Sequence, residues 1–383
     1  MIGDRWATEL WCPTSGERLP LDEPAGLSSV GKPLLVDYHL EPGQGRPWAA
    51  SLEGREWSIW RYRELLPIRD VSQRVSLGEG GTPMVRLRRR RGGPTVWIKQ
   101  EAGNPTGSFK ARGLAMAVSR AVELGAPGVE LPSAGNAALA LSAYAAAAGL
   151  PARVAMPTDT PGAIRRRCLE YGAEVLMTGT TLVESAAGLA ESPVGFWNLS
   201  TLREPYRVEG KKTMGLEIAE QLGWCLPDWI LYPTGGGTGI IGMHKAFAEL
   251  RQLGLVGERT PRLVAVQSDG CAPIVRAFEQ GLDHAPTWEA PESTIWGLRV
   301  PQAIGDFLVL EALRESGGRA VAVPEASAAP AGLRLQRQEG LVAGPEGGAA
   351  MVALEMLVED GVMSDRDVVV VFQTGHPGNY AES

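Results

Sequence analysis

The sequence predicts an α/β protein built on parallel sheets. From about Pro94 onward, short apolar runs bounded by Gly, Pro or Asp alternate with longer Ala-rich stretches. Most of the short runs are β-branched, and alternation of this kind is typical of buried parallel strands joined by helices. A chain of 383 residues exceeds what one hydrophobic core usually serves, so we expect two domains.

Residues 1–65 are rich in Pro, Gly and Trp and weakly periodic, so we expect an irregular extension there with a few short strands. Beyond it, the apolar runs predict strands at Thr95–Lys99, Gly128–Leu131, Arg153–Met156, Glu174–Met177, Trp229–Tyr232, Leu263–Gln267, Ala320–Val323 and Val368–Phe372. The stretches between them predict helices at Phe109–Leu124, Asn136–Ala148, Ile164–Tyr171, Met214–Leu222, Ile240–Leu253, Ile274–Gln280, Phe307–Glu315, Ala326–Glu339 and Gly348–Glu359. The small side chains of residues 134–149 suggest a helix packed closely against a sheet.

Charge and composition narrow the class of protein. The net charge is −7, from 37 basic and 44 acidic residues, which argues against a nucleic-acid or acidic-membrane partner because either needs a basic face. The four cysteines are far apart and lack metal-like spacing, so we expect free thiols and no metal site. No signal peptide or membrane-spanning run is visible, and we expect a soluble, cytoplasmic protein.

The first segment that carries chemistry is Asn104-Pro-Thr-Gly-Ser-Phe-Lys110-Ala-Arg-Gly113. Thr106 and Ser108 are good N-cap types, and an apolar-periodic helix follows. Lys110 is therefore expected in the first helical turn, where the positive end of the helix dipole disfavours a further positive charge. A lysine held there becomes neutral more easily, as a Schiff base requires. The alternative is a solvent-exposed lysine near a helix start.

The second segment is Thr234-Gly-Gly-Gly-Thr-Gly239, which lies between an expected strand and an expected helix. Consecutive glycines let backbone N–H groups converge on an anion, and the helix N-terminus adds its dipole. The segment thus predicts a phosphate-binding loop. A dinucleotide-binding turn is the alternative, but no acidic residue follows a second strand about twenty residues later.

The third segment is Ser133-Ala-Gly-Asn136, again between a strand and a helix. Its hydroxyl, backbone amides and side-chain amide suit a carboxylate or a ring oxygen. A plain helix cap is the alternative for so short a motif.

Together these segments resemble the fold-type-II pyridoxal-phosphate (PLP) enzymes, and specifically the threonine synthases. The likeness covers almost the whole chain and includes further motifs in the same order, at Trp60–Pro67, Leu77–Pro83, Arg207–Thr213 and Gln267–Cys271. It implies two open twisted sheets flanked by helices, with the irregular N-terminal extension at 1–65. It also implies a large PLP-binding domain of residues 66–114 and 211–383, a smaller domain inserted at 115–210, and a homodimer.

The resemblance also implies roles for the residues that would bind PLP. Lys110 would hold the cofactor as a Schiff base beside Phe109, and Asn136 would bind the ring hydroxyl. The phosphate would lie on Gly235, Gly236, Gly237 and Thr238. Thr374 matches the residue that meets the pyridine nitrogen, and a hydroxyl there makes the ring a weaker electron sink, which favours elimination and replacement over transamination.

For the substrate, the resemblance implies a small, phosphorylated amino acid. Ser133 would take its carboxylate, while Arg207, Asn198 and Lys211 match positions near its phosphate. The implied reaction of this carbon–oxygen lyase converts O-phospho-L-homoserine and water to L-threonine and phosphate. One alternative is β-elimination or β-replacement on serine, phosphoserine or threonine. Another is a non-catalytic binding protein, against which the intact Lys110, Asn136 and glycine loop argue.

Several residues depart from the family pattern. Ala111 follows Lys110 where Asp is common, and the final motif reads Thr374-Gly-His-Pro-Gly-Asn-Tyr380 where Gly-Leu-Lys usually follows Gly-His. Cys12 has no partner cysteine, so the zinc site of some relatives is not expected. Two side chains stay open: Glu346 is either an acid near the cofactor or a structural helix start, and His376 meets the ring edge or faces solvent.

Overall fold

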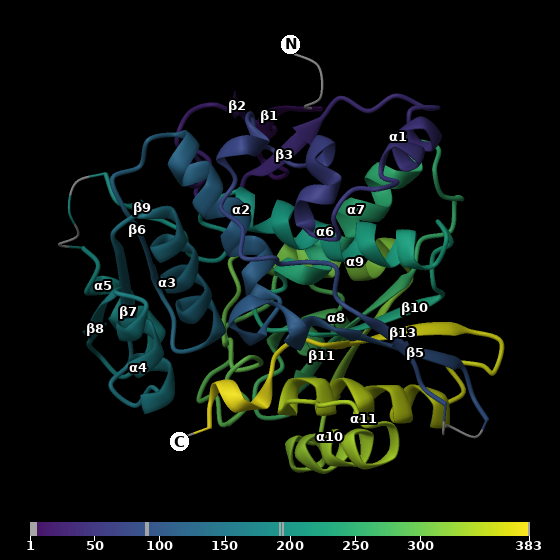
Figure 1. The fold of residues 1–383 in the computed structure, drawn as a ribbon. Coiled ribbons are helices and arrows are strands. Elements are labelled where there is room, and N and C mark those ends of the chain that lie inside the picture. The colour runs from purple at the N-terminus through teal and green to yellow at the C-terminus, as the bar shows by residue number, and fades with distance from the viewer. Residues whose placement is uncertain (1–5, 89–91, 191–192, 194, 382–383) are drawn as a thin grey trace.

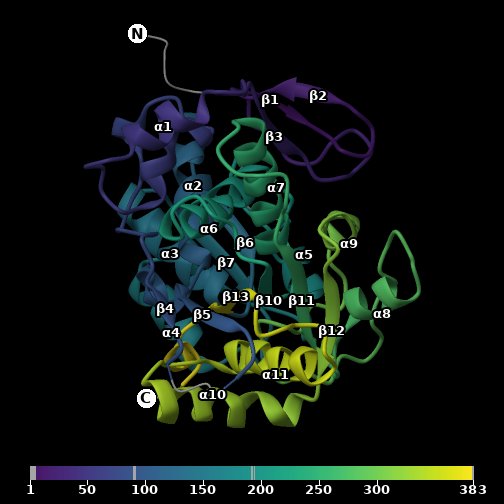
Figure 2. The same cartoon turned by 90° about the vertical axis from the view of Figure 1, so that its right-hand side faces the viewer.

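The N-terminal region folds against the rest of the chain in a computed structural model that describes residues 6–88, 92–190, 193 and 195–381. It contains a three-stranded antiparallel sheet, ordered β2-β1-β3, formed by β1 (Ala7–Trp11), β2 (Arg18–Pro20) and β3 (Leu35–Tyr38). Helix α1 (Gly45–Ser51) and 3-10 turns at Ile59–Leu65 and Val71–Gln73 follow. This sheet lies at the opposite end of the molecule from helix α10 (Glu325–Glu339), as Figure 2 shows.

The larger sheet has six strands in the order β12-β11-β10-β13-β5-β4, and all neighbours are parallel except β4 and β5. Its strands are β4 (Met84–Arg86), β5 (Thr95–Gln100), β10 (Trp229–Pro233), β11 (Arg262–Ser268), β12 (Arg319–Val323) and β13 (Val368–Gln373). Alternate residues of β10 face different cores: Leu231 joins one and Ile230 the other. Both faces of β10 are buried, which explains why this central strand is apolar throughout.

Helices cover both faces of the large sheet. Helices α10 and α11 (Pro345–Glu359) lie on one side, and α6 (Tyr206–Gln221), α7 (Thr238–Gln252) and α9 (Asp306–Glu315) lie on the other (Figure 1). The short helix α8 (Pro273–Glu279) packs against α9, the edge strand β12 and its neighbour β11. Because the strands β5, β10, β11, β12 and β13 are parallel, their carboxyl ends lie along the same edge of the sheet. Ligands of such sheets bind at this edge.

The smaller sheet has four parallel strands in the order β8-β7-β6-β9. They are β6 (Val129–Pro132), β7 (Ala152–Met156), β8 (Glu174–Met177) and β9 (Trp197–Asn198), and they pack against α3 (Asn136–Ala148), α4 (Gly162–Glu170) and α5 (Leu182–Ala187). Helix α2 (Lys110–Glu123) contacts both α3 and α6, so it lies between the two sheets (Figure 1). The domain boundaries after residues 114 and 210 fall inside α2 and α6 and stay predictions.

The predicted α/β class with two helix-flanked sheets is confirmed, and each of the predicted strands and helices is present. The main difference is α6, which begins at Tyr206 and not at Met214. Its first two turns hold Arg207, Glu209, Lys211 and Lys212, which are all buried. When charged residues occur on every side of a helix, the sequence shows no apolar repeat of 3.6 residues. The start of α6 therefore could not be recognised from the sequence. No helix in the described part of the chain is long and apolar enough to cross a membrane.

Candidate active site

Lys110 is the first residue of α2, as the sequence predicted. The predicted caps are wrong, because neither Thr106 nor Ser108 caps the helix and Phe109 occupies the N-cap position. The reason is a backbone contact: Ser108 forms a bridge with Gly375, and the Phe109 N–H donates to the Thr374 carbonyl at 3.1 Å. The freed hydroxyls of Thr106 and Ser108 are buried, and neither has a hydrogen-bond partner among the described residues.

Two glycines bring α2 and α6 into close contact. A Cβ at Gly210 would lie 2.1 Å from the Arg112 carbonyl oxygen, and one at Gly113 would lie 2.9 Å from the Arg207 carbonyl oxygen. Only glycine lets the two backbones approach so closely. The crossing sets Lys110, at the start of α2, beside Arg207 and Lys211 in the first turns of α6.

Lys110 lies in an environment that favours its neutral form. Its Nζ is 4.3 Å from the centre of the Phe109 ring, and the Nζ of Lys211 is 5.5 Å from the same ring. Burial, and then the charge of Arg207, lowers the pKa of Lys110 to about 7, while Glu346 opposes the shift. A substantial share of Lys110 is therefore an uncharged amine at neutral pH, which is the nucleophilic form.

The glycine loop lies between β10 and α7, and its shape requires glycine. Gly237 has a φ of +75°, and a Cβ there would lie 2.2 Å from Cγ2 of Val309. A Cβ at Gly235 would lie 2.5 Å from the Gly297 carbonyl oxygen. Thr238 is the first residue of α7, where N–H groups lack intrahelical acceptors. The loop is thus a narrow backbone cradle at a helix N-terminus.

Lys211 connects this cradle to the Lys110 segment. Its Nζ donates to Oγ1 of Thr238 at 2.6 Å. Burial, together with the charges of Arg207 and Lys110, lowers the pKa of Lys211 well below its usual value. The sequence placed Lys211 near a substrate phosphate; in the structure its contact is with the glycine loop.

Thr374 and Asn136 are tied to the turn that precedes Lys110. Thr374 is buried at the end of β13, next to the Phe109 N–H. Asn136 is the first residue of α3, and its Oδ1 accepts a hydrogen bond from Nδ2 of Asn379 at 2.6 Å. That same Nδ2 donates to the Thr106 carbonyl at 3.0 Å. The turn before α2, the start of α3 and the segment after β13 therefore meet at one place.

Arg207 is buried, and only part of its guanidinium donates hydrogen bonds to the described residues. Its Nη1 donates to the Leu199 carbonyl at 2.7 Å, but Nε and Nη2 have no hydrogen-bond partner in the described ranges. Burial lowers the pKa of Arg207, and Glu204 opposes the shift. Buried donors are normally satisfied, so these two indicate a ligand with acceptor oxygens.

The other two predicted substrate residues lie at the ends of strands of the small sheet. Asn198 ends β9, and its Oδ1 accepts from the Ser200 N–H at 2.9 Å. It therefore shapes the turn that presents the Leu199 carbonyl to Arg207. Ser133 follows β6, and its Oγ accepts from the Gly135 N–H at 3.3 Å.

The family model described as "Pyridoxal-phosphate dependent enzyme" matches residues 75–375 of this chain. The chain belongs to this family. A threonine synthase of Methanocaldococcus jannaschii is 32% identical over 95% of this chain and 91% of that protein. One from Methanosarcina acetivorans is 35% identical over 83% of this chain and 79% of that protein. Among solved structures, a threonine deaminase from T.th. superposes with a TM-score of 0.65 at 27% identity, covering 79% of this chain and 94% of that one.

The residues of this PLP-dependent enzyme fit the cofactor. A phosphate carries between one and two negative charges and three acceptor oxygens, and the loop offers backbone N–H groups at a helix N-terminus that follows three residues without side chains, Gly235, Gly236 and Gly237. Lys110 supplies an amine with a pKa of about 7 for the aldehyde. The Ser108 hydroxyl, which has no hydrogen-bond partner in the described part of the chain, adds a buried polar group to the same segment.

Sequence reasoning missed Glu204, which lies beside Arg207 in the candidate site. Its carboxylate accepts from the N–H groups of Tyr206 and Arg207 at 2.7 and 3.0 Å, so it satisfies free donors at the start of α6. Burial raises the pKa of Glu204 to about 7. An acidic residue just before a helix complements the positive end of the helix dipole, and this is the local signal that would have pointed to Glu204.

The structure shows where the two side chains with undecided roles, Glu346 and His376, lie. Glu346 is the second residue of α11, and its Oε1 accepts from the Gly297 N–H at 3.2 Å, so it is part of a helix start. It is also close to the site, because burial raises the pKa of Glu346 and the charge of Lys110 opposes that shift. His376 is exposed, and its Nδ1 accepts from the Gly378 N–H at 3.0 Å.

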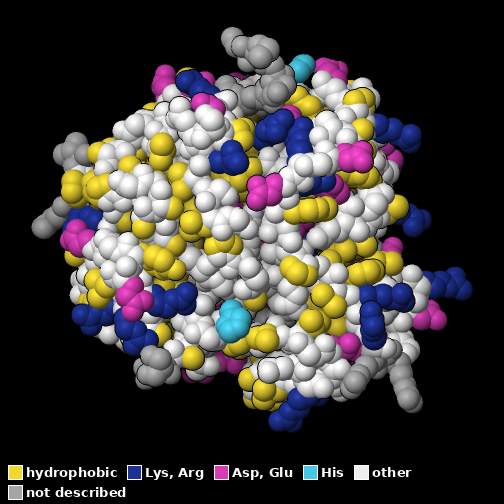
Figure 3. Space-filling model, viewed as in Figure 1, with side chains coloured by type: hydrophobic (Ala, Val, Ile, Leu, Met, Phe, Trp, Pro, Cys, Tyr) yellow, Lys and Arg dark blue, Asp and Glu magenta, His cyan; other side chains and the backbone are white. Residues whose placement is uncertain are grey.

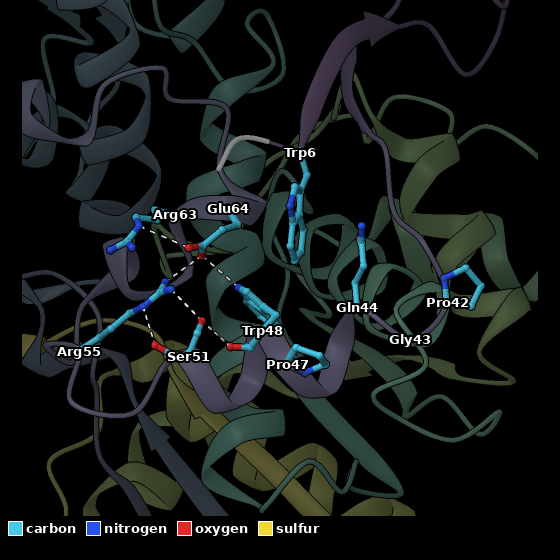
Figure 4. A pocket seen from close by; sticks show the side chains of 10 residues that line it. All are labelled: Trp6, Pro42, Gly43, Gln44, Pro47, Trp48, Ser51, Arg55, Arg63 and Glu64. Atoms are coloured by element: carbon cyan, nitrogen blue, oxygen red, sulfur yellow. Dashed lines mark hydrogen bonds and ion pairs between the residues drawn. The ribbon is translucent and has the colours of Figure 1, made fainter. Parts of the chain in front are cut away.

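A separate pocket of about 650 Å³ lies in the N-terminal region (Figure 4). Trp6 and Trp48 form one part of its wall, and the ion pair between Arg55 and Glu64 forms another. None of the predicted site residues lines it. It is therefore distinct from the site around Lys110.

Proposed function

We propose that this enzyme converts O-phospho-L-homoserine and water to L-threonine and inorganic phosphate. The observation that carries the proposal is the unused part of the Arg207 guanidinium, whose Nε and Nη2 are buried without partners among the described residues. A planar fork of this kind matches the oxygens of a phosphate. The curated relatives named threonine synthase support the same reaction.

The glycine loop is the place that we propose for the cofactor's own phosphate. The N–H groups of residues 235–238 would hold it, and Lys211 would contribute through Thr238, to which it donates. Lys110 would hold PLP as a Schiff base beside Phe109, Asn136 would donate to the ring oxygen and Thr374 would meet the ring nitrogen. The substrate's phosphate would then belong to Arg207, with Asn198 shaping the turn beside it and Ser133 taking the carboxylate.

Lys110 is the proton carrier in this proposal. When bound, PLP supplies an electron sink for the substrate's Cα and the carbons beyond it. Because the pKa of the free Lys110 amine is about 7, it is matched to accepting and returning protons near neutral pH. Arg207 would hold the phosphate while the bond from Cγ to oxygen breaks. The hydroxyl of a water would then add at Cβ, its proton would go to the released phosphate, and the two protons taken from Cα and Cβ would be replaced at Cα and Cγ.

The alternative reaction is β-elimination or β-replacement on serine, phosphoserine or threonine. It is supported by the two departures from the family pattern, at Ala111 and at residues 377–379, and by the similarity to a threonine deaminase structure. Phosphoserine would also satisfy Arg207, so the substrates must be compared directly.

The first experiment measures phosphate and threonine released from O-phospho-L-homoserine by the purified, PLP-loaded enzyme. We expect equal amounts of both products and none from Lys110→Ala, while Arg259→Ala, a change at an exposed basic residue, should match the wild type. Serine, phosphoserine and threonine are tested in parallel for 2-oxo acid. Phosphoserine turnover without phosphohomoserine turnover would select the alternative reaction.

We also propose, from the family resemblance, that the enzyme is a cytoplasmic homodimer with domains at 66–114 plus 211–383 and at 115–210. Analytical ultracentrifugation of the full chain tests the dimer, and a sedimenting species with the monomer mass would remove it.

A further inference from the structure

Asn379 joins three parts of the molecule through one side-chain amide. It lies in the 3-10 turn Pro377–Asn379 that follows β13, and it is 4% exposed. Its Nδ2 donates to Oδ1 of Asn136 on α3 at 2.6 Å and to the Thr106 carbonyl at 3.0 Å. Its Oδ1 accepts from Nη1 of Arg167 on α4 at 2.9 Å.

This chain of contacts fixes the orientation of two amides. Arg167 only donates hydrogen bonds, so it selects the oxygen of the Asn379 amide. The Asn379 nitrogen must then face Asn136, and a nitrogen selects the oxygen of the Asn136 amide. The Asn136 nitrogen is left to point the other way, and a Cβ built at Gly375 would lie 3.1 Å from it. Gly375 is the neighbour of Thr374, so the Asn136 nitrogen is turned toward the proposed cofactor site.

The orientation matters because the ring oxygen of PLP is an acceptor when it is ionised. Only the nitrogen of an Asn136 amide can donate to it, and a flipped amide would set one oxygen against another. An amide without fixed neighbours samples both orientations. The Asn136 amide, whose oxygen is held by Asn379, already has the orientation that the cofactor requires.

We propose that Asn379 is a positioning residue that sets the Asn136 amide to donate to the cofactor, with Arg167 as the outer end of the relay. The proposal rests on the placement of PLP against Asn136 and not on the identity of the substrate. It gives the unusual Pro377-Gly378-Asn379 sequence a role in this enzyme's cofactor site.

The decisive variant is Asn379→Asp. The new carboxylate still accepts from Arg167, so that contact survives, but it can no longer donate to Asn136. The Asn136 amide then turns its nitrogen toward the carboxylate and its oxygen toward the ring. We expect the Kd for PLP to rise about tenfold or more, as for one lost charge-assisted hydrogen bond, and the visible absorbance band of the bound cofactor to shift.

A double-mutant cycle separates positioning from general damage. If Asn379 acts through Asn136, adding Asn379→Asp to Asn136→Ala should change neither the Kd nor the absorbance band further. Additive losses would overturn the proposal, as would wild-type affinity and absorbance in Asn379→Asp alone. If Asn136→Ala itself leaves the PLP Kd unchanged, the placement of the cofactor fails first, whatever Asn379 does.

Changes at Arg167 test the relay from its outer end, where the side chain is only partly buried and folding is less at risk. Arg167→Leu should raise the PLP Kd roughly two- to fivefold because the Asn379 amide loses one of the two contacts that orient it, the Thr106 carbonyl being the other, and Arg167→Lys should restore most of the affinity. Arg165→Leu, on the exposed side of the same helix, is the control. Equal effects of the leucine changes at 165 and 167 would contradict the relay.

Discussion

Three basic side chains, Lys110, Arg207 and Lys211, converge in the interior. Burial lowers the pKa values of all three, and for the two lysines repulsion from neighbouring cations adds to the shift. The acids that oppose these shifts are Glu204 and Glu346, whose own pKa values are raised by burial. A buried excess of positive charge is unfavourable unless anions arrive. The proposed function supplies two, the phosphate of the cofactor and that of the substrate, and each has a separate set of donors.

The residue-scale prediction concerns Arg207→Gln. Removing the charged donors for the substrate phosphate should lower kcat/KM for O-phospho-L-homoserine roughly 10²- to 10³-fold, the loss of one or two hydrogen bonds to a charged group. The Kd for PLP should change much less, because we place the cofactor phosphate on the glycine loop and not on Arg207. Steady-state kinetics and cofactor titration measure both quantities.

Arg203→Gln is the matched control, since Arg203 is exposed four residues earlier and should retain full activity. Unchanged kcat/KM in Arg207→Gln would remove Arg207 from the substrate site and leave its unpartnered donors without this explanation.

At the scale of elements, close approaches at glycine build the site. Gly113 and Gly210 let α2 cross α6, which sets Lys110 beside Arg207. Gly237 turns the chain from β10 into α7 with a φ that L-residues rarely adopt. Both features depend on a missing Cβ, so each is sensitive to the smallest possible substitution.

Gly237→Ala tests the cradle against a matched control. Gly340 has a similar φ, +73°, with no atom within 4 Å of an added Cβ, so Gly340→Ala should cost only about 1–2 kcal/mol of stability. At Gly237 the methyl group also meets Val309 at 2.2 Å, which should add about 1–3 kcal/mol for overpacking. Urea unfolding measures the difference.

PLP affinity separates the two glycines further. We expect it to fall at least about tenfold in Gly237→Ala, as for the loss of one hydrogen bond to a charged group, and to stay at the wild-type value in Gly340→Ala. Equal affinity in both variants would show that the loop does not hold the cofactor's phosphate.

The sequence predicted those elements whose pattern is local. The strands are continuous apolar runs, and the glycine loop indicates its backbone geometry directly. The first turns of α6 were missed because their charged side chains are buried by pairing within the fold, as where Glu209 meets Lys212. The cap at Phe109 and the Asn136–Asn379 contact were also missed, because both depend on a chain segment more than two hundred residues away. No local pattern carries that information.

At the scale of the whole molecule, charged groups on the surface and in the interior have different roles. Basic and acidic side chains are interspersed over the face in Figure 3. Inside, Glu217 on α6 binds Lys99 of β5 at 2.6 Å and Arg112 of α2 at 2.7 Å, and all three side chains are fully buried. Burial acts to raise the pKa of Glu217, but Arg112 and Lys99 outweigh it and hold the value at about 2. This network joins the large sheet to the two helices that carry Lys110 and Arg207.

Glu217→Gln should therefore destabilise the protein far more than the loss of an exposed pair. The substitution keeps the size of the side chain but leaves Lys99 and Arg112 buried with one carboxylate fewer, which should cost about 3–5 kcal/mol. Glu355→Gln breaks the exposed pair between Glu355 and Arg334, and its cost should stay below about 1 kcal/mol. Urea unfolding of the two variants at neutral pH compares these costs directly. Equal losses would mean that the buried network contributes no more than a surface pair, and the placement of α2 on α6 would then depend on other contacts, among them the Gly113–Gly210 crossing.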